Sequence, residues 1–375
     1  MLMFEKVFKF TTKDLTKLTL MIIIATLLFG LPGLIMMLFL QWITFQSYAL
    51  ESVDKHGISQ ISASRLGGAA IFLSSLMMYI FGAYSGVIVT TNFSTASIII
   101  WLSAFFCMAL GLIDDLINDF LSPRARLISI SLIFSLCLVF MPSLIPPKIG
   151  LIGLDFLLDN VLFGFILTVV FCVGFINAMN MADGANGLIP GTITVAFIVF
   201  YMEAPSVTYA ILMTSCGLFT IFNIISGRLF LGDAGAYGLG SLLALNGLYL
   251  FSSGVFSAAF LAVLFAYPCI DILVTVTRRR IHGRSVFLPD NDHLHNRIHF
   301  HCQRWFKSKT LSNSLTGVLI VFFSSGLALL GFIMDWWPVT SNQWAWIFLV
   351  QCAIYLVAFV AGGLNRPSSQ FVISQ

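Results

Sequence analysis

Long apolar runs separated by short polar connections dominate this chain. A helix needs about 20 mainly apolar residues to cross the hydrocarbon core of a bilayer. These runs do not alternate apolar and polar positions, so they predict helices rather than the strands of a membrane barrel. The predicted spans are eleven, at residues 18–43, 67–90, 97–113, 127–144, 160–178, 188–202, 207–225, 236–253, 256–277, 313–335 and 343–363. We therefore expect an all-α, polytopic membrane helix bundle, with one integral membrane domain over residues 1–375.

The composition agrees with a chain surrounded by lipid. Hydrophobic residues make up 59% of the 375 positions and charged residues 9%, whereas ordinary globular chains carry about 25% charged residues. The length alone would suggest two soluble domains, but so few charges cannot cover them. The net charge of +3 gives no support for nucleic-acid binding, and the hydrophobicity excludes a disordered chain. The seven cysteines form no C-x-x-C pair, so we interpret them as small apolar residues.

Lysine and arginine predict which ends of the spans face the cytoplasm. With eleven spans the two termini lie on opposite sides, and fourteen of the 19 basic residues fall on the side away from the N-terminus. The positive-inside rule makes that side cytoplasmic. The four lysines before residue 18 oppose this orientation of the first span. The loops that follow keep their relative sidedness, because it depends only on the spans between them.

Acidic residues gather on the side that this topology predicts to be cytoplasmic. Asp114 and Asp115 follow the third span, Asp183 follows the fifth, and Asp233 follows the seventh. The longest polar segment, residues 278–313, follows the ninth span and faces the same compartment. An ionised carboxylate at a membrane boundary is costly unless it is paired or binds a metal. This convergence predicts a functional site.

The individual acids favour different interpretations. Adjacent carboxylates repel each other and are more stable beside a cation such as Mg²⁺, which favours a functional role for Asp114 and Asp115. For Asp119 we prefer the interpretation of a solvated residue at a helix end. Asp233 lies in the segment GDAG, where glycine permits a ligand to approach the backbone closely. A helix break with small residues for tight packing is the alternative for that segment.

Residues 177–187 place polar side chains at intervals of three, namely Asn177, Asn180, Asp183 and Asn186. If the segment is helical, these positions drift slowly along one face. Amide side chains both donate and accept hydrogen bonds, which suits a nucleobase or a sugar, while the carboxylate suits a hydroxyl group or a cation. Ordinary turns of Asn, Asp and Gly are the alternative.

The polar segment 278–313 contains a histidine-rich motif. Four of the six histidines cluster between residues 293 and 301, at His293, His295, His299 and His301. A zinc site is disfavoured, because only one thiol is nearby and H-x-H is a common pattern. Arginine and histidine near paired acids are better suited to phosphate recognition. We interpret the three arginines at 278–280 as an anchor on the positive side of the membrane.

These groups together suit phosphoryl transfer between a soluble nucleotide and a lipid phosphate at a membrane surface. In such a reaction, positioning and charge neutralisation dominate catalysis. A secondary transporter is the alternative from another class, because intramembrane charges also mark permeation paths. Transporters tend to place their binding groups near the bilayer midplane, in inverted repeats. Here the acids crowd one predicted face, and the sequence shows no convincing internal repeat.

The chain resembles the polyprenyl-phosphate N-acetylhexosamine-1-phosphate transferases over roughly residues 54–300. The motifs that carry the resemblance are, in chain order, SRLGG at 64–68, the Asp114-Asp115 pair, the 177–187 segment, Asn223 ten residues before Asp233 in FLGDAG, Asp271 in the ninth span, and Pro289-Asp290 leading to His293-Leu294-His295. The resemblance implies an enzyme that transfers a sugar-1-phosphate from a UDP-sugar to undecaprenyl phosphate and releases UMP. It also implies the bacterial cytoplasmic membrane as the location, with the active site facing the cytoplasm.

The resemblance further implies roles for particular residues. Asp233 matches the ligand of Mg²⁺, for which Mn²⁺ is an alternative ion. The acids that match catalytic positions are Asp114, Asp115 and Asp183. The residues implied in substrate binding are Asn177, Asn180, Asn186, Asn223, His293, His295 and Arg297.

The histidine motif separates branches of the family. Its PDxxHLH form is more similar to the branch that starts O-antigen, enterobacterial common antigen or teichoic acid synthesis than to the peptidoglycan branch, which has three consecutive histidines. The chain has Asn186 where the family usually has Asp and Asn296 where it usually has His, so the choice of N-acetylhexosamine is left open. The stretch before Arg65 lacks the usual Pro-rich pattern, which leaves the roles of Lys55 and His56 open. A homodimer is also left open.

Overall fold

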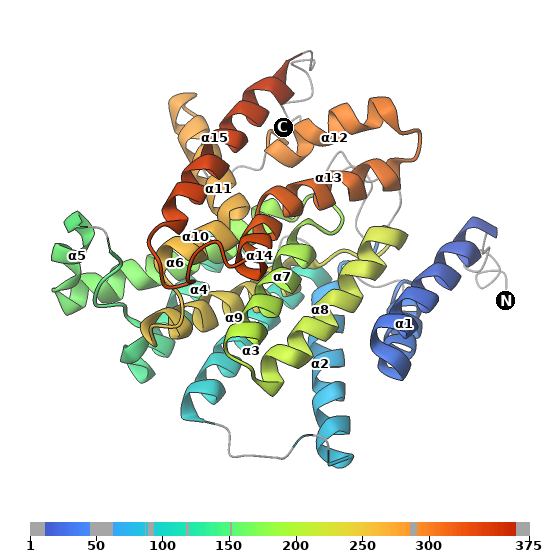
Figure 1. Cartoon of the computed structure of the whole chain (residues 1–375), viewed down its shortest axis with the longest axis horizontal. Helices are drawn as coiled ribbons and strands as arrows, with labels where there is room; N and C mark the ends of the chain where they lie inside the picture. Colours follow the sequence, from blue (N-terminus) through green and yellow to red (C-terminus); the bar gives the residue numbers. More distant parts are fainter. Residues whose placement is uncertain are drawn as a thin grey trace.

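A computed structural model describes residues 12–45, 63–86, 88, 94–117, 120–150, 152–285 and 291–364. Over these ranges the chain folds into helices without a named strand (Figure 1), which confirms the expected all-α membrane bundle. The helices are α1 (Thr12–Ile43), α2 (Gly67–Tyr84), α3 (Thr95–Leu116), α4 (Pro123–Phe140), the short 3-10 helix η1 (Pro142–Leu144), α5 (Ile152–Leu158), α6 (Val161–Ala182), α7 (Leu188–Glu203), α8 (Val207–Ser226), α9 (Gly232–Ser252), α10 (Ala258–Leu264), α11 (Ala266–Ile281), α12 (Leu294–Trp305), α13 (Lys309–Phe323), α14 (Ser325–Ile333) and α15 (Trp344–Gly363). Asp119, Lys55, His56, Pro289 and Asp290 lie outside the described residues.

Each of the eleven predicted spans coincides with a helix or with a bent pair of helices. Within the described ranges, eight helices are long and apolar enough to cross a bilayer, and two bent pairs would bring the number to ten. The remaining predicted span is α7, which has 16 residues. At 1.5 Å per residue it extends about 24 Å, less than the roughly 30 Å of a hydrocarbon core.

Polar side chains at the boundaries explain where many of the helices begin. A serine or asparagine side chain accepts a hydrogen bond from a backbone N–H of the first turn, as Ser94 does from Ser97 N over 3.1 Å. Such N-caps satisfy donors that the helix itself leaves unpaired. The other residues that begin helices in this way are Ser122, Asn160, Ser206, Ser257 and Ser308.

Helix α9 forms the centre of the bundle. Of its apolar stretch, 83% is buried, whereas the same share in the other candidate spans lies between 17% and 44%. It packs against α2, α3 and α6. Apolar residues of the peripheral helices point outward, for example Leu27 of α1 and Val161 of α6, which are 81% and 76% exposed. This distribution fits a protein whose outer surface meets lipid.

Glycine allows two helices to approach α9 closely. A Cβ atom on Gly68 of α2 would lie 2.0 Å from a backbone nitrogen of α9, and one on Gly111 of α3 would lie 2.3 Å from the carbonyl oxygen of Asp233. Small residues at such contacts let helix backbones come together in membrane bundles. The approach of α3 brings Asp114 and Asp115, one turn beyond Gly111, to the first turn of α9.

Two of the predicted spans are bent rather than continuous. The axes of α10 and α11 meet at 81°, and those of α13 and α14 meet at 46°. The two breaks contact each other, since Tyr267 N donates to Ser324 Oγ over 3.0 Å. Gln351 of α15 lies against both breaks, with its Nε2 3.0 Å from Ser324 O and 3.4 Å from Val263 O. A break inside a membrane needs such partners for the freed carbonyls.

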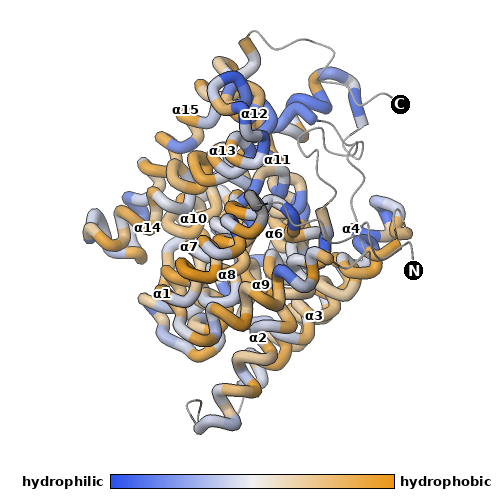
Figure 2. The backbone as a smooth tube through the Cα atoms, turned by 90° about the vertical axis from the view of Figure 1, so that its right-hand side faces the viewer, coloured by the Kyte–Doolittle hydropathy of each residue, from blue (hydrophilic) through white to orange (hydrophobic). Residues whose placement is uncertain are grey.

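The polar segment 278–313 contains a helix that the span count did not predict. Helix α12 occupies its middle, while α11 extends to Ile281 and α13 begins at Lys309. Figure 2 shows the most hydrophilic stretches of the backbone gathered around α12 and the nearby end of α11, while α2, α3 and α8 are mainly hydrophobic. One end of the bundle is therefore polar, and the candidate residues lie toward it.

Candidate active site

Asp115 fixes the start of the central helix. Its Oδ1 accepts a hydrogen bond from Asp233 N over 3.0 Å, and its Oδ2 accepts one from Ala234 N over 2.8 Å. The side chain is buried, and Arg65 Nη1 lies 3.8 Å from Oδ1. Asp115 thus serves as an N-cap for α9 that is supplied by α3, and its charge lies at the positive end of the α9 dipole.

Two motifs far apart in the sequence join beside this cap. Ser64 and Leu229 form an isolated parallel bridge, and Phe230 N donates to Ser64 O over 2.8 Å. Gly232 has a φ of +72°. A Cβ atom there would lie 2.2 Å from Arg65 O and 2.7 Å from Asp115 Oδ2. SRLGG and FLGDAG therefore form one backbone unit, and glycine is required at position 232 both for its conformation and for its contacts.

Asp114 and Asp233 form the acidic part of the site. Asp114 is buried and makes an ion pair with Arg126 Nη2, while its Oδ1 accepts from Leu121 N over 3.3 Å. The Asp233 carboxylate lies within electrostatic range of Asp114, Arg126 and Arg65. Like charges held this close need cations. Arg65 belongs to the SRLGG motif, whereas Arg126 had been counted only in the charge balance of the membrane sides.

The donor set of this cluster fits a hard divalent cation. Mg²⁺ prefers oxygen ligands, and it commonly binds one or two carboxylates together with phosphate oxygens of the substrate. The side chains of Asp114 and Asp233 supply two such carboxylates. No group of three histidine, cysteine or acidic side chains that could hold a metal alone occurs in the ranges the structure describes.

Asn180 joins the acidic cluster to helix α6. Its Nδ2 donates to the hydroxyl of Tyr237 over 3.1 Å. Tyr237 lies one turn beyond Asp233 in α9, and the guanidinium carbon of Arg126 lies 5.8 Å from the centre of its ring. Tyr237 was not among the site residues predicted from the sequence. Its position four residues after Asp233, on the same face of a helix, could have indicated that it lies near the site.

The four polar residues of the 177–187 segment do not share one helical face. Helix α6 ends at Ala182, so only Asn177 and Asn180 lie within it. Asp183 follows as the C-cap residue, and Asn186 lies in the turn before α7. The Asn177 Nδ2 donates to Val173 O over 2.7 Å on its own helix. Both interpretations of the segment hold in part, since a helical half is followed by a turn.

Asn186 and Asn223 build this turn from inside. Asn223 Oδ1 accepts from Gly187 N over 2.6 Å, and its Nδ2 donates to Leu229 O over 2.7 Å. Asn186 N donates to Asn313 Oδ1 over 2.9 Å, while the buried Asn186 Oδ1 has no hydrogen-bond partner in the part of the chain that the structure describes. Asn223 therefore ties the turn to the strand-like segment before Asp233. A role of either side chain in substrate binding stays a prediction.

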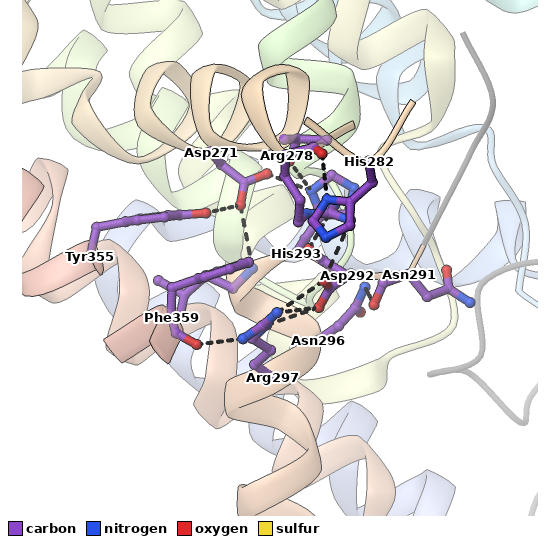
Figure 3. A network of polar contacts seen from close by, with 12 residues as sticks. Asp271, Arg278, His282, Asn291, Asp292, His293, Asn296, Arg297, Tyr355 and Phe359 are labelled. Carbon is purple, nitrogen blue, oxygen red and sulfur yellow. Dashed lines mark hydrogen bonds and ion pairs between the residues drawn. The ribbon is translucent and has the colours of Figure 1, made fainter. Parts of the chain in front are cut away.

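The two motif histidines are held by separate partners. His293 Nδ1 lies 2.6 Å from Asp271 Oδ2, and the hydroxyl of Tyr355 donates to Asp271 Oδ1 over 2.6 Å (Figure 3). The hydroxyl of Tyr267 and His295 Nδ1 are hydrogen-bonded over 2.9 Å. The two imidazole rings stack, with centres 5.3 Å apart and planes 4° apart. Because Asp271 occupies Nδ1, any hydrogen bond from His293 to a substrate would involve Nε2.

His295 also contacts the turn after α6. A Cβ atom on Gly184 would lie 2.1 Å from His295 Nε2, so glycine is needed beside the ring. Gly184 is the neighbour of Asp183, so the histidine motif and the 177–187 segment meet here. The four segments that the sequence predicted to converge are therefore connected by contacts, from Asp115 through α9 and Asn180 to His295.

Arg297 lies in this region but is held by other parts of the fold. Its Nε and Nη2 donate to the two Asp292 carboxylate oxygens over 2.8 and 2.9 Å, and its Nη1 donates to Phe359 O over 2.6 Å (Figure 3). The guanidinium also lies 3.5 Å from the centre of the Phe359 ring. These contacts attach α12 to α15. The substrate-binding role expected for Arg297 stays a prediction.

The amino-acid sequence is similar to those of known proteins over most of its length. Residues 97–252 match the family model of glycosyl transferase family 4. A probable undecaprenyl-phosphate N-acetylglucosaminyl 1-phosphate transferase of Bacillus subtilis is 24% identical over 371 residues, which cover 93% of this chain and 95% of the relative. A phospho-N-acetylmuramoyl-pentapeptide-transferase of Geobacillus is 25% identical, and the matched region covers 80% of this chain and 92% of the length of that relative. An undecaprenyl-phosphate alpha-N-acetylglucosaminyl 1-phosphate transferase of Thermotoga maritima is 26% identical, and the matched region covers 67% of this chain and 73% of the length of that relative.

The polar site at one end of a lipid-facing bundle and these relatives define the class, an integral membrane transferase. More narrowly, residues 97–252 match glycosyl transferase family 4, and the chain is similar over most of its length to polyprenyl-phosphate sugar-phosphate transferases. The expected enzyme class is confirmed, and the transporter alternative is set aside. The relatives include both N-acetylglucosaminyl and muramoyl-pentapeptide transferases, so they do not separate the branches of the family.

Proposed function

We propose that this protein transfers an N-acetylhexosamine-1-phosphate from a UDP-sugar to undecaprenyl phosphate, with release of UMP, at the cytoplasmic face of the bacterial inner membrane. One observation carries the proposal. Asp114, Asp233, Asn180 and the two motif histidines, which come from four distant segments, form one connected polar site at one end of a membrane bundle. The predicted excess of arginine on that side supports the cytoplasmic orientation.

In this proposal Asp114 and Asp233 would hold a divalent cation, Mg²⁺ or Mn²⁺. The cation would neutralise negative charge on the phosphates, which is its usual contribution to phosphoryl transfer. Arg126 and Arg65 lie beside the two carboxylates. Their guanidinium groups match phosphate oxygens in geometry and charge. The 177–187 segment, with Asn180 and Asp183, and His293 with His295 would bind the uridine and sugar parts.

The reaction exchanges one phosphorus–oxygen bond for another. An oxygen of the undecaprenyl phosphate attacks the sugar-linked phosphorus, and the bond from that phosphorus to the oxygen of UMP breaks. UMP leaves with the electron pair of that bond. Asp115 and Asp114 were equal candidates for positioning or deprotonating the acceptor phosphate. Both oxygens of Asp115 accept backbone hydrogen bonds from the start of α9, whereas Asp114 faces Arg126 and the Asp233 carboxylate, so we assign this role to Asp114. A two-step route through an aspartyl intermediate is the alternative.

The histidine motif indicates the donor and the pathway. Residues 293–296 read HLHN instead of containing three consecutive histidines. We therefore propose that the donor is a simple UDP-N-acetylhexosamine and that the lipid-linked product starts the synthesis of a cell-surface polysaccharide. The peptidoglycan precursor is the less favoured donor. Among the described residues, the buried amide oxygens of Asn186 and Asn296 have no hydrogen-bond partner, and both lie at positions where the family usually has ionisable groups.

The test is a transfer assay with the purified, detergent-solubilised full chain, undecaprenyl phosphate and Mg²⁺. UDP-N-acetylglucosamine, UDP-N-acetylgalactosamine and UDP-N-acetylmuramoyl-pentapeptide are offered separately, and UMP and the lipid product are quantified. We expect UMP and lipid-linked sugar from an N-acetylhexosamine donor, loss of both with EDTA, and loss of both in Asp233→Asn. Release of UMP only with the muramoyl-pentapeptide donor would overturn the donor assignment. Turnover by Asp233→Asn at the wild-type rate would contradict the site.

A further inference from the structure

The last membrane helix, α15, contacts α11 and α12 at three places. Tyr355 donates to Asp271 of α11, and Phe359 O accepts from Arg297 of α12 (Figure 3). His301 Nε2 of α12 donates to Gly362 O over 3.2 Å. Helix α15 lies beyond residues 97–252, which match the family model. The segment that carries the predicted sugar-nucleotide residues is therefore attached to a helix outside the matched domain.

Asp271 connects Tyr355 to His293. Its Oδ1 accepts from the Tyr355 hydroxyl and its Oδ2 faces His293 Nδ1, each over 2.6 Å, while Leu294 N makes a longer contact of 3.4 Å with Oδ1. Asp271 is 1% exposed and Tyr355 is 4% exposed. A buried carboxylate is stable only when its oxygens are paired. The tyrosine hydroxyl therefore fixes the rotation of the carboxylate, and the carboxylate in turn fixes the plane of the imidazole.

The orientation of the His293 ring also affects other residues of the site. Its ring is stacked on that of His295, and His295 lies against Gly184 beside the predicted catalytic Asp183. A ring rotated at His293 would lose this parallel stacking. The groups that Tyr355 influences thus belong to the part of the site proposed for the UDP-sugar, while the acidic cluster of Asp114 depends on other contacts.

We propose that Tyr355 is a positioning residue for the sugar-nucleotide site and that it acts through Asp271 on His293. This inference rests on the proposed function, in which His293 binds the donor. A buried hydrogen bond that only stabilises the bundle is the competing explanation. The two explanations differ in one respect, because a positioning role changes the KM for the donor while the KM for undecaprenyl phosphate stays the same.

The first experiment compares two matched Tyr→Phe variants. Tyr355→Phe removes the hydroxyl and keeps the ring, which stacks on Phe359 with centres 6.0 Å apart. We expect its donor KM to rise about tenfold, the size of effect that follows loss of a hydrogen bond to a charged group. Tyr209→Phe is the control, because Tyr209 is also buried and donates to Asn246 Oδ1 over 3.0 Å on another pair of helices. An equal rise in the control, or an equal rise in the acceptor KM, would overturn the proposal.

The second experiment tests whether the effect passes through His293. Tyr355→Phe is combined with His293→Gln, and the donor KM of the double variant is compared with that of His293→Gln alone. We expect the tyrosine substitution to add nothing once the imidazole is gone. The same fold-increase in both backgrounds would show that Tyr355 acts independently of His293, and the proposal would fail.

A third measurement does not depend on turnover. Diethyl pyrocarbonate labels imidazole nitrogens, and mass spectrometry gives the labelling rate of His293 with the exposed His282 as an internal reference. We expect a severalfold faster rate at His293 in Tyr355→Phe than in the wild type, and no change in Tyr209→Phe. An unchanged rate in Tyr355→Phe would overturn the proposal. A wild-type protein without transferase activity would contradict the proposed function, while this labelling rate would still decide the role of Tyr355.

Discussion

The carboxylate of Asp115 binds the backbone of Asp233, so the acidic pair of α3 and the aspartate of α9 that we propose as a metal ligand are parts of one local structure. Two backbone N–H groups at the start of α9 donate to the two oxygens of a single side chain. The two adjacent acids of the motif therefore have different structural roles. Asp115 positions α9, and Asp114 faces Arg126 and the Asp233 carboxylate.

This division predicts different consequences for the two Asp→Asn substitutions. In Asp115→Asn one of the two acceptors becomes an NH₂ group that faces a backbone donor, so we expect the free energy of unfolding to fall by about 1–3 kcal/mol together with activity. Asp114→Asn keeps an oxygen for Leu121 N and should lose transfer with a smaller change in stability. Thermal unfolding in detergent and UMP release measure the two effects. A melting temperature of Asp115→Asn equal to that of the wild type would contradict the capping role.

The close approach of α2 to α9 gives a second prediction. In Gly68→Ala the new Cβ would lie 2.0 Å from the backbone of α9, so the helices must separate, at a cost of about 1–3 kcal/mol of stability. We expect lower activity as well, since SRLGG and FLGDAG are bonded to each other. Gly247→Ala is the matched control, because a Cβ atom there meets nothing within 4 Å. Equal melting temperatures for the two variants would show that the contact at Gly68 is not tight.

Most of the fold, and the convergence of the motif residues at one end of the bundle, were predictable from the sequence. The spans follow from the length of the apolar runs, and the convergence of Asp114, Asp233 and the histidine motif follows from counting crossings. The bends at Phe265 and Ser324 were not predictable, because local hydrophobicity does not record that Gln351, far along the chain, satisfies the freed carbonyls. Apolar runs that continue through a break look like continuous helices.

Partner choice was the other feature that the sequence did not determine. Arg297 was expected to bind substrate; in the structure its nitrogens bind Asp292 and Phe359 O, and the substrate-binding role stays a prediction. Arg126, by contrast, was counted only as a charge on one membrane side, yet it pairs with Asp114. Pairing depends on three-dimensional distance, which one sequence does not give for residues in loops.

The pairing of Arg126 with Asp114 leads to a third prediction. Arg126→Gln removes the positive charge beside the two carboxylates, so we expect transfer to fall by about 100-fold, as when a preorganised donor for negative charge is lost. Arg124→Gln is the control, because Arg124 is exposed two residues earlier in the same helix. Initial rates of UMP release over a range of donor concentrations give the comparison. Equal losses in the two variants would indicate a general effect of positive charge at this membrane face.

The pH dependence of stability tests a histidine outside the membrane spans. Burial, with the nearby charge of Lys309, lowers the pKa of His299 from its ordinary value of 6.5 to about 4. Between these two values the unfolded chain binds a proton that the folded chain does not, so stability falls as the pH drops from 6.5 toward 4. The contribution is complete above pH 6.5 and is at most about 3 kcal/mol.

The measurement compares melting temperatures between pH 7.5 and 4.5 in the wild type, His299→Gln and His282→Gln. His299→Gln removes the titrating group, so we expect its melting temperature to fall less steeply with decreasing pH than that of the wild type. His282 is exposed, so its replacement should leave the wild-type slope unchanged. The carboxylates are the same in all three proteins. The difference between the curves of melting temperature against pH therefore reports the titration of His299. Parallel curves for the wild type and His299→Gln would mean that this imidazole is protonated in the folded protein as readily as in the unfolded chain.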